Sequence, residues 1–386
     1  MPDRRDTGGV TDGSVAREDG SVNERVWNFS PGPAILPPQV LEQAGERVRS
    51  LPGAGASILE VSHRSSSFRA ILDEAESNLR ELLEVPDEHR VLFLQGGASL
   101  QFSMAPMNLL RGSARTGAHV VTGSWGEKAV AEARKEGDVV VVWDGGPSGY
   151  SSVPDLAQLN VADDSAYLHV TSNETIQGVE LPAGSEPPSG PFLVADTSSD
   201  FLSRPIPLER YGLLYAGAQK NAGPAGLTIT LIREDVLARI PEGLPSMLDY
   251  RTFAEHRSLY NTPPVFAIDV LMLVTRWIRD EVGGLDKMHE RNGEKAALLY
   301  EAIDTSDGFY RGHARAEARS LMNVTFRLPD GTLDAAFVSE AAANGLLELK
   351  GHRSVGGIRA SIYNAMPLEG VRTLRAFMDE FRLRNS

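Results

Sequence analysis

The chain of 386 residues contains no cysteine. This absence excludes a disulfide scaffold, a thiolate nucleophile, thiolate zinc sites and iron–sulfur clusters. It is compatible with a cytoplasmic location, which we expect. Long apolar runs are also missing, because the best candidate, residues 265–278, is interrupted by Asp269 and Arg276. Since roughly 18 apolar residues are needed to span a bilayer, we expect no membrane segment.

Positive charge is scarce as well. The 38 basic residues face 52 acidic ones, which gives a formal net charge of −14. Nucleic acids and anionic membrane surfaces are bound through a positive field, so we expect neither as a partner. An anion site in this chain must therefore be a local cluster of cations. Only six of the basic residues are lysines, so each lysine can be considered individually.

Residues 1–25 combine Gly, Ser, Asp and Arg with very few apolar side chains. They lack the apolar stretch of a signal peptide, and their acidic residues argue against a transit peptide. We expect a disordered extension there. A large α/β domain is predicted for residues 26–284 and a smaller α+β domain for residues 285–386.

Seven short apolar runs in the first of these domains alternate with helical or turn segments. Short, β-branched runs without polar alternation are typical of a parallel sheet that is covered on both faces. Ligands are then expected at the carboxyl ends of the strands. The runs are residues 91–94, 119–122, 139–143, 167–171, 192–195, 213–216 and 227–232.

Helical periodicity is clearest around Phe68, Ile71, Leu72, Ala75 and Leu79. Pro263 and Pro264 open a second long helix, which the glycines at 283 and 284 end. Beyond them the sequence predicts a helix (286–303), a strand (321–328), a further helix (333–343) and a final amphipathic helix.

The first strand runs into Gln95-Gly96-Gly97-Ala98-Ser99, and a helix follows. Such a turn presents free backbone N–H groups and a positive dipole end to an anion. A tight turn with Ser99 as helix cap remains an alternative. A P-loop motif is absent, and the glycine pattern at residues 53–58 is an incomplete dinucleotide fingerprint that follows a helix.

Lys220 lies between two apolar runs, so its amine is a candidate nucleophile with a pKa lowered by burial. The alternative is a lysine that extends out to solvent from a strand end. The other five lysines are next to charged or turn residues, and we expect them to be solvated. They are Lys128, Lys135, Lys287, Lys295 and Lys350.

Two further residues follow predicted strands. Asp196 stands at a strand's carboxyl end and could pair with a pyridinium nitrogen, or simply cap a turn. Trp125 could stack on a planar ring or belong to the core.

Three cationic segments could meet anionic substrate groups, since arginine forks and histidine donors suit phosphates and carboxylates. Each by itself could be a solvated surface feature. They are His63-Arg64, His352-Arg353 and Arg359.

Together these segments resemble the phosphoserine aminotransferase family, a class V branch of the fold type I enzymes that use pyridoxal 5′-phosphate (PLP). The resemblance covers nearly the whole chain from Asn28. The motifs that carry it are FSPGP (29–33), SHRS (62–65), QGGASLQF (95–102), NETIQGV (173–179), ADTSSD (195–200), GAQKN (217–221), NTPP (261–264), GHR (351–353) and GGIRASIYNA (356–365).

The resemblance implies a mainly parallel seven-stranded sheet flanked by helices, and a homodimer with shared active sites. Lys220 would form the Schiff base with PLP, Asp196 would pair with its pyridine nitrogen, and Trp125 would stack on its ring. Other cofactor contacts are implied for Ala98, Ser99, Thr175 and Gln219, and for Asn261 and Thr262 of the neighbouring subunit.

For the substrate, the resemblance implies that Arg359 binds the α-carboxylate. His63, Arg64, His352 and Arg353 would meet the distal anion, the first two from across the interface. The implied reaction moves the amino group of L-glutamate to 3-phosphohydroxypyruvate, giving O-phospho-L-serine and 2-oxoglutarate in serine biosynthesis. A related reaction on phosphohydroxythreonine serves vitamin B6 synthesis.

Some family members carry an arginine where this chain has Ser99 and a serine where it has Pro31. Which cations hold the substrate phosphate therefore stays open. Two alternatives remain as well: a class V aminotransferase of the alanine- or serine-glyoxylate type, and a non-catalytic protein that binds a phosphometabolite. The two His-Arg pairs favour a doubly charged distal group over a methyl or hydroxyl group.

Overall fold

The computed structural model describes residues 26–386, so the expected disordered extension lies outside the described residues. Its centre is a seven-stranded sheet in the order β2-β10-β9-β8-β5-β3-β4. Only β10 is antiparallel to its neighbours, which confirms the mainly parallel sheet. The strands are β2 (His89–Leu94), β3 (Gly117–Val121), β4 (Val139–Asp144), β5 (Tyr167–Thr171), β8 (Leu193–Asp196), β9 (Tyr211–Gly217) and β10 (Thr228–Arg233).

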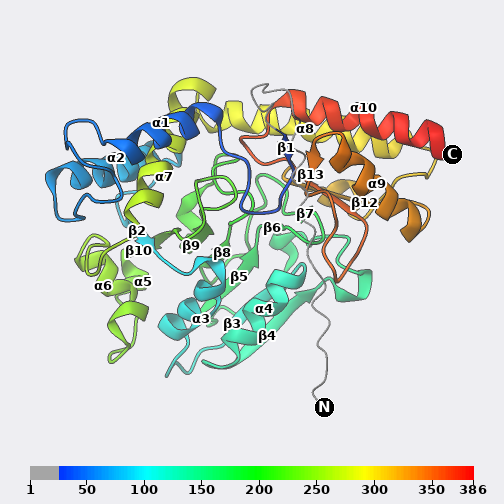
Figure 1. The fold of residues 1–386 in the computed structure, drawn as a ribbon. Helices are drawn as coiled ribbons and strands as arrows, with labels where there is room; N and C mark the ends of the chain where they lie inside the picture. Colours follow the sequence, from blue (N-terminus) through cyan, green and yellow to red (C-terminus); the bar gives the residue numbers. More distant parts are fainter. Residues whose placement is uncertain (1–25) are drawn as a thin grey trace, which may run out of the picture.

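Helices cover both faces of this sheet (Figure 1). Along β2, Val91 and Phe93 belong to one apolar core, and Leu92 and Leu94 belong to another, because side chains alternate across a strand. The first core contains α1 (Pro38–Arg49), α2 (Ser66–Leu82) and α7 (Val265–Trp277). The second contains α3 (Gly97–Leu109), α4 (Ser124–Ala133), α5 (Glu234–Leu237) and α6 (Tyr250–Glu255).

The helix predicted after Pro264 is confirmed. It begins at Val265, continues beyond α7 as a wider turn through Val282, and ends at Gly283 with φ +90. That left-handed conformation suits glycine, which explains the sharp stop. Arg47 of α1 and the buried Asp269 of α7 form an ion pair of 2.6 Å that joins these two helices.

A second, smaller unit packs at the C-terminal end of the chain. Its helices are α8 (Leu285–Asp304), α9 (Gly331–Ala343) and α10 (Leu368–Asn385), and its antiparallel sheet contains β11 (Arg311–Gly312), β12 (Asn323–Arg327) and β14 (Ile358–Ser361). The helices and the strand predicted for this region are confirmed.

The beginning of the described chain joins this smaller unit. β1 (Trp27–Asn28) pairs with β13 (Leu346–Leu347) in parallel, and Phe29 lies fully buried in the C-terminal core. Long-range pairing of this kind leaves no local sequence pattern. The domain boundary after residue 284 stays a prediction.

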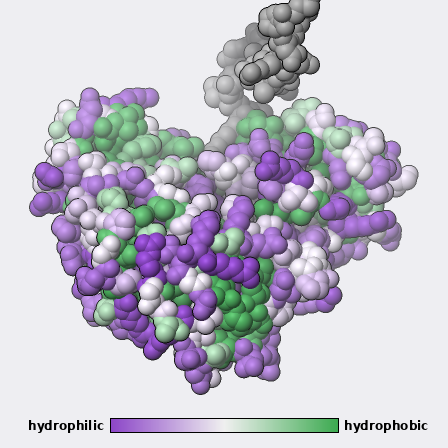
Figure 2. Space-filling model, turned by 90° about the horizontal axis from the view of Figure 1, so that it is seen from below, coloured by the Kyte–Doolittle hydropathy of each residue, from purple (hydrophilic) through white to green (hydrophobic). Residues whose placement is uncertain are grey.

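The surface is mixed. Figure 2 shows mostly hydrophilic side chains on one face, with apolar areas between them. Exposed large apolar side chains include Leu59, Val140 and Leu383, which belong to different parts of the chain. None of the helices within residues 26–386 has the length and apolar content to cross a membrane.

Candidate functional site

Four of the expected site residues follow the carboxyl ends of neighbouring parallel strands. Trp125 follows β3, Thr175 follows β5, Asp196 ends β8 and Lys220 follows β9. Parallel strands end at the same edge of a sheet, and this is where α/β proteins bind their ligands. The structure therefore brings these residues together as the sequence predicted.

The amine of Lys220 is held by two hydroxyl groups. Its Nζ donates hydrogen bonds to Thr175 Oγ1 at 2.8 Å and to Ser199 Oγ at 2.7 Å, and these two hydroxyls lie 2.7 Å apart. The ring centroid of Trp125 lies 5.9 Å from Nζ. Ser199 was not singled out from the sequence, although the ADTSSD motif contains it.

The surroundings shift the pKa values of Lys220 and Asp196 toward each other. Burial lowers the pKa of Lys220 to about 8, although the carboxylates nearby oppose this shift. Burial also raises the pKa of Asp196, which the Lys220 ammonium counteracts. Asp196 is fixed by the backbone N–H of Ser198, which donates to its Oδ1 at 3.0 Å. An amine whose pKa lies close to neutral pH, next to a buried carboxylate, is typical of a catalytic site.

Glu174 is a further buried acid that sequence reasoning missed. Its carboxylate accepts hydrogen bonds from the backbone N–H groups of Trp125 at 3.0 Å and Gly126 at 2.8 Å, at the N-terminus of α4. Burial raises the pKa of Glu174 to about 7. Its position in β6 (Asn173–Glu174) within the NETIQGV motif was the available signal. Glu174 fixes the start of the helix that carries Trp125.

The turn between β2 and α3 has the geometry of an anion cradle. Gly96 has φ +92, and a Cβ there would lie 2.6 Å from Leu100, so only glycine fits. Within residues 26–386 the backbone N–H groups of Ala98 and Ser99 have no hydrogen-bond partner, as expected in the first turn of a helix. These two amides are free to bind an anion.

The smaller unit contributes Arg359 from β14. Arg359 is 7% exposed and donates to the carbonyl of Thr175 at 3.5 Å, while its Nε has no partner among the described residues. Burial lowers its pKa. An arginine with an unused donor beside the Lys220 group can bind a carboxylate.

Further cations lie around Arg359. Burial lowers the pKa of His352, and the charges of Arg359, Arg353 and Lys128 add to this effect, so these four groups share one electrostatic environment. Nζ of Lys128 lies 3.9 Å from the ring centroid of Trp125. The sequence had suggested only that Lys128 is solvated. Its position three residues after Trp125 on one helix explains the contact.

Other expected site residues are not joined to Lys220 by a contact within residues 26–386. His63 and the exposed Arg64 lie in the turn before α2. Gln219 is half-buried next to Lys220, and the carbonyl of Thr262 accepts from Gln95 Nε2 at 3.4 Å, beside the glycine turn. Their roles, and that of Asn261, stay predictions.

One expectation about the lysines was wrong. Lys295 is only 2% exposed, and its Nζ donates to the carbonyls of Ile362 at 2.8 Å and Tyr363 at 2.7 Å. The charged neighbour Glu294 suggested solvent, but the helical spacing with Met288 places Lys295 on the buried face of α8. The other four lysines that were expected to be solvated, Lys128, Lys135, Lys287 and Lys350, are exposed.

The residues present fit PLP. The Gly96 turn with its free amides fits the phosphate, and the buried Trp125 Nε1 has no partner within the described chain. The amine of Lys220 fits the aldehyde group, and Asp196 is a buried carboxylate for a ring nitrogen. Each feature matches a different part of one ligand.

Comparison with known proteins agrees with this geometry. The family model described as aminotransferase class-V matches residues 26–374. The phosphoserine aminotransferase of Rhodopirellula baltica is 54% identical over 371 residues, which cover 96% of this chain and 99% of that relative. The relative of the same name from Geobacillus kaustophilus is 52% identical and covers 94% of this chain and 99% of its own length.

Solved structures give the same result. The phosphoserine aminotransferase from Bacillus circulans subsp. alkalophilus superposes with a TM-score of 0.91 at 47% identity, covering 94% of this chain and 99% of that one. The PLP-bound phosphoserine aminotransferase from Trichomonas vaginalis has a TM-score of 0.86 at 40% identity and covers 92% of this chain and 100% of that one. The chain therefore belongs to the class V aminotransferases, in the phosphoserine aminotransferase family.

Proposed function

We propose that this protein is a PLP-dependent phosphoserine aminotransferase that exchanges the amino group between L-glutamate and 3-phosphohydroxypyruvate. The observation that carries the proposal is the amine of Lys220, held 2.8 Å from Thr175 Oγ1 and 2.7 Å from Ser199 Oγ beside the buried Asp196. The close relatives of that name support the choice of reaction.

When bound, PLP supplies a carbonyl group that condenses with amines and a ring that accepts the electrons of a carbanion. Lys220 is suited to hold it covalently, because a pKa of about 8 leaves an appreciable share of neutral amine near neutral pH. Once released by an incoming amine, Lys220 would take the proton from the substrate Cα as general base. The hydroxyls of Thr175 and Ser199 orient its Nζ for both tasks.

Asp196 would keep a proton on the ring nitrogen, which strengthens the ring as an electron acceptor. Its fixed hydrogen bond from Ser198 holds the carboxylate in place. Trp125, at the start of α4, would stack on the ring, with Ala98 and Ser99 holding the phosphate and Gln219 adding a side-chain contact.

Arg359 would bind the α-carboxylate of the substrate through its unused donor. The distal group must be accepted both as the γ-carboxylate of glutamate and as a phosphate. The cations Arg353 and Lys128 beside the His352 imidazole support this, because a shared positive environment attracts either anion. A methyl or hydroxyl group, as in alanine or serine, would leave these cations without a partner.

The proposal includes a homodimer in which His63, Arg64, Asn261 and Thr262 complete the partner's site. The exposure of Arg64 and Thr262 in the single chain supports this part, since both are accessible to a second copy. A cytoplasmic location also remains a prediction, as does use of phosphohydroxythreonine.

The test is the absorbance of the purified, PLP-loaded protein before and after addition of O-phospho-L-serine, with L-alanine as the control substrate. The band of the lysine-bound cofactor should disappear with phosphoserine and persist with alanine. A response to alanine alone would mean that the protein is an aminotransferase that acts on another substrate. Failure to take up PLP would contradict the whole proposal.

A further inference from the structure

A second group of cations lies at the opposite edge of the large sheet. Arg115 precedes β3, Phe192 precedes β8, Arg210 precedes β9, and Arg233 ends the antiparallel β10. All these positions are at the amino ends of the parallel strands, whereas Lys220 follows their carboxyl ends. Together with Arg239 they line a pocket of about 350 Å³.

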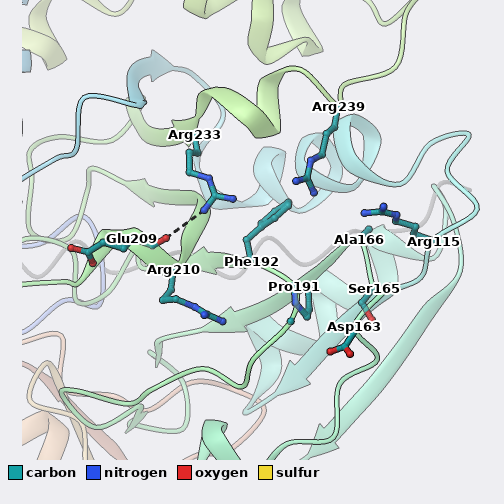
Figure 3. A pocket seen from close by; sticks show the side chains of 11 residues that line it. Arg115, Asp163, Ser165, Ala166, Pro191, Phe192, Glu209, Arg210, Arg233 and Arg239 are labelled. Atoms are coloured by element: carbon teal, nitrogen blue, oxygen red, sulfur yellow. Dashed lines mark hydrogen bonds between the residues drawn. The ribbon is translucent and has the colours of Figure 1, made fainter.

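The side chains converge on one space. Figure 3 shows the guanidinium groups of Arg115, Arg233 and Arg239 directed toward the Phe192 ring. The side chain of Arg210 extends below the ring, on the side of Pro191. The guanidinium carbons of Arg233 and Arg239 lie 5.7 Å and 5.3 Å from the Phe192 ring centroid. Stacking on an aromatic ring fixes the plane of a guanidinium and leaves its edge free to donate.

The arginines are only partly neutralised. Asp235 forms ion pairs with Arg233 and Arg239, the second at 3.0 Å. Arg210, by contrast, donates only to the carbonyl of Pro188, at 2.7 Å. The side chain of Arg115 makes no hydrogen bond or ion pair within residues 26–386. Two arginines therefore keep unpaired charge here, on a protein whose net charge is −14.

Two acids also line the pocket, but neither pairs with an arginine in the described part of the chain. The carboxylate of Glu209 points away from Phe192 (Figure 3), and only its backbone carbonyl accepts from Arg233, at 3.4 Å. Asp163 lies near Ser165 at the other side of the pocket.

The hollow continues beyond the arginines. A neighbouring pocket of about 470 Å³ shares Arg115, Phe192 and Arg239. It adds Leu109 and Pro241 as apolar walls, next to the polar segment of residues 111–113. A ligand that uses both parts can place an anionic group among the arginines and a short carbon skeleton along Leu109 and Pro241. Both volumes lie in the range of small-molecule sites.

We propose that this arginine pocket binds a small phosphate ester, with its phosphate among the four arginines and its carbon skeleton toward Leu109 and Pro241. Several arginine forks from separate segments suit the oxygens of a phosphate dianion. A nucleic acid needs an extended positive surface, which a hollow on an acidic protein does not provide. The site is separate from the proposed active site and needs no transamination to be detected.

The experiment is calorimetric titration of the PLP-loaded protein with glycerol 2-phosphate at low salt, with glycerol as the uncharged control. The pocket of wild type should bind one equivalent per chain, in addition to what the phosphate-binding group of the proposed active site takes up. Arg115→Ala should weaken this binding several-fold, and Arg115→Ala/Arg239→Ala at least tenfold. Because the Arg115 side chain has no partner, its removal leaves the fold intact, which far-ultraviolet circular dichroism checks.

Two further variants locate the binding. Arg372→Ala/Arg384→Ala removes two exposed arginines of α10 and should bind like wild type. His352→Ala/Arg353→Ala removes two groups of the proposed active site that would meet a phosphate, and this variant should keep the pocket's heat signal. Absence of binding to wild type would overturn the proposal. So would a heat signal that Arg115→Ala/Arg239→Ala leaves unchanged, or one that the α10 pair or His352→Ala/Arg353→Ala abolishes.

Discussion

Ser199 Oγ lies 2.7 Å from the Nζ of Lys220, across 21 residues of sequence. The contact exists because β8 and β9 are parallel neighbours, so the segments after them meet at one edge of the sheet. Ser199 and Thr175 together accept two hydrogen bonds from the amine and define its direction. The two hydrogen bonds link the pKa of Lys220 to these hydroxyl groups, and this link can be tested by titration.

The rate at which apoprotein captures PLP should depend on the charge of Lys220. Burial lowers the pKa of Lys220 to about 8, so the fraction of neutral amine increases with pH up to about 8 and then levels off. The capture rate, followed by the absorbance of the bound cofactor, should rise about tenfold per pH unit below 8 and level off above it.

Ser199→Ala removes one acceptor of the ammonium and should move the midpoint of that curve to lower pH. Ser203→Ala, a buried serine that donates to the carbonyl of Asp200, is the matched control and should leave it unchanged. A rate that keeps rising toward pH 10 would show that Lys220 titrates like a solvated lysine.

Replacement of Arg359 should affect substrate binding most. Lysine cannot reproduce the two parallel donors of a guanidinium, so Arg359→Lys should lower kcat/KM for L-glutamate by about 100-fold, or about 2.7 kcal/mol. Most of the loss should come from a raised KM, measured by steady-state kinetics. Arg311→Lys, at an exposed position of β11, is the control. Equal activity of the two variants would contradict the assigned role.

Glu174→Gln should change stability in a pH-dependent way. Burial raises the folded-state pKa of Glu174 to about 7 from 4.5, so the folded chain holds this proton more tightly than the unfolded chain. The stabilisation of the folded state by this bound proton is fully present below pH 4.5 and is lost as the pH rises through 7. Glutamine stays neutral at every pH. Between pH 4.5 and 8, the unfolding free energy of the variant should therefore rise by about 3 kcal/mol relative to that of wild type.

Chemical denaturation at several pH values measures this difference. Glu127→Gln, which changes an exposed carboxylate of α4, the helix whose N-terminus Glu174 contacts, is the control variant. A stability difference between Glu174→Gln and wild type that does not change with pH would mean that Glu174 ionises at low cost in the folded protein.

Lys295→Met should destabilise the smaller unit. The change leaves the carbonyls of Ile362 and Tyr363 buried without their donor, which costs about 2–4 kcal/mol of unfolding free energy. Lys287→Met, on the exposed face of the same helix, should stay within about 0.5 kcal/mol of wild type. Denaturant midpoints compare the two, and similar values would show that the buried amine contributes little.

Much of the fold was predictable because its signals are local. The seven apolar runs became the seven strands, and proline and glycine marked the ends of the helix that begins at Val265. The lysine, the aspartate and the glycine turn were recognisable because each directly follows a strand. Lys295 was misjudged from Glu294 beside it, since immediate neighbours in a helix point in different directions.

The sequence by itself determined the sheet-forming segments, the family, and the residues whose chemistry a bound cofactor needs: Lys220, Asp196 and the turn at Gly96. Only the tertiary structure decided which groups surround them. Ser199 reaches the amine, Glu174 holds the helix of Trp125, and four arginines meet around Phe192 at the far edge of the sheet. The reason is physical: strand and helix periodicity is written in neighbouring residues, whereas these contacts join segments that only the packing of the sheet brings together.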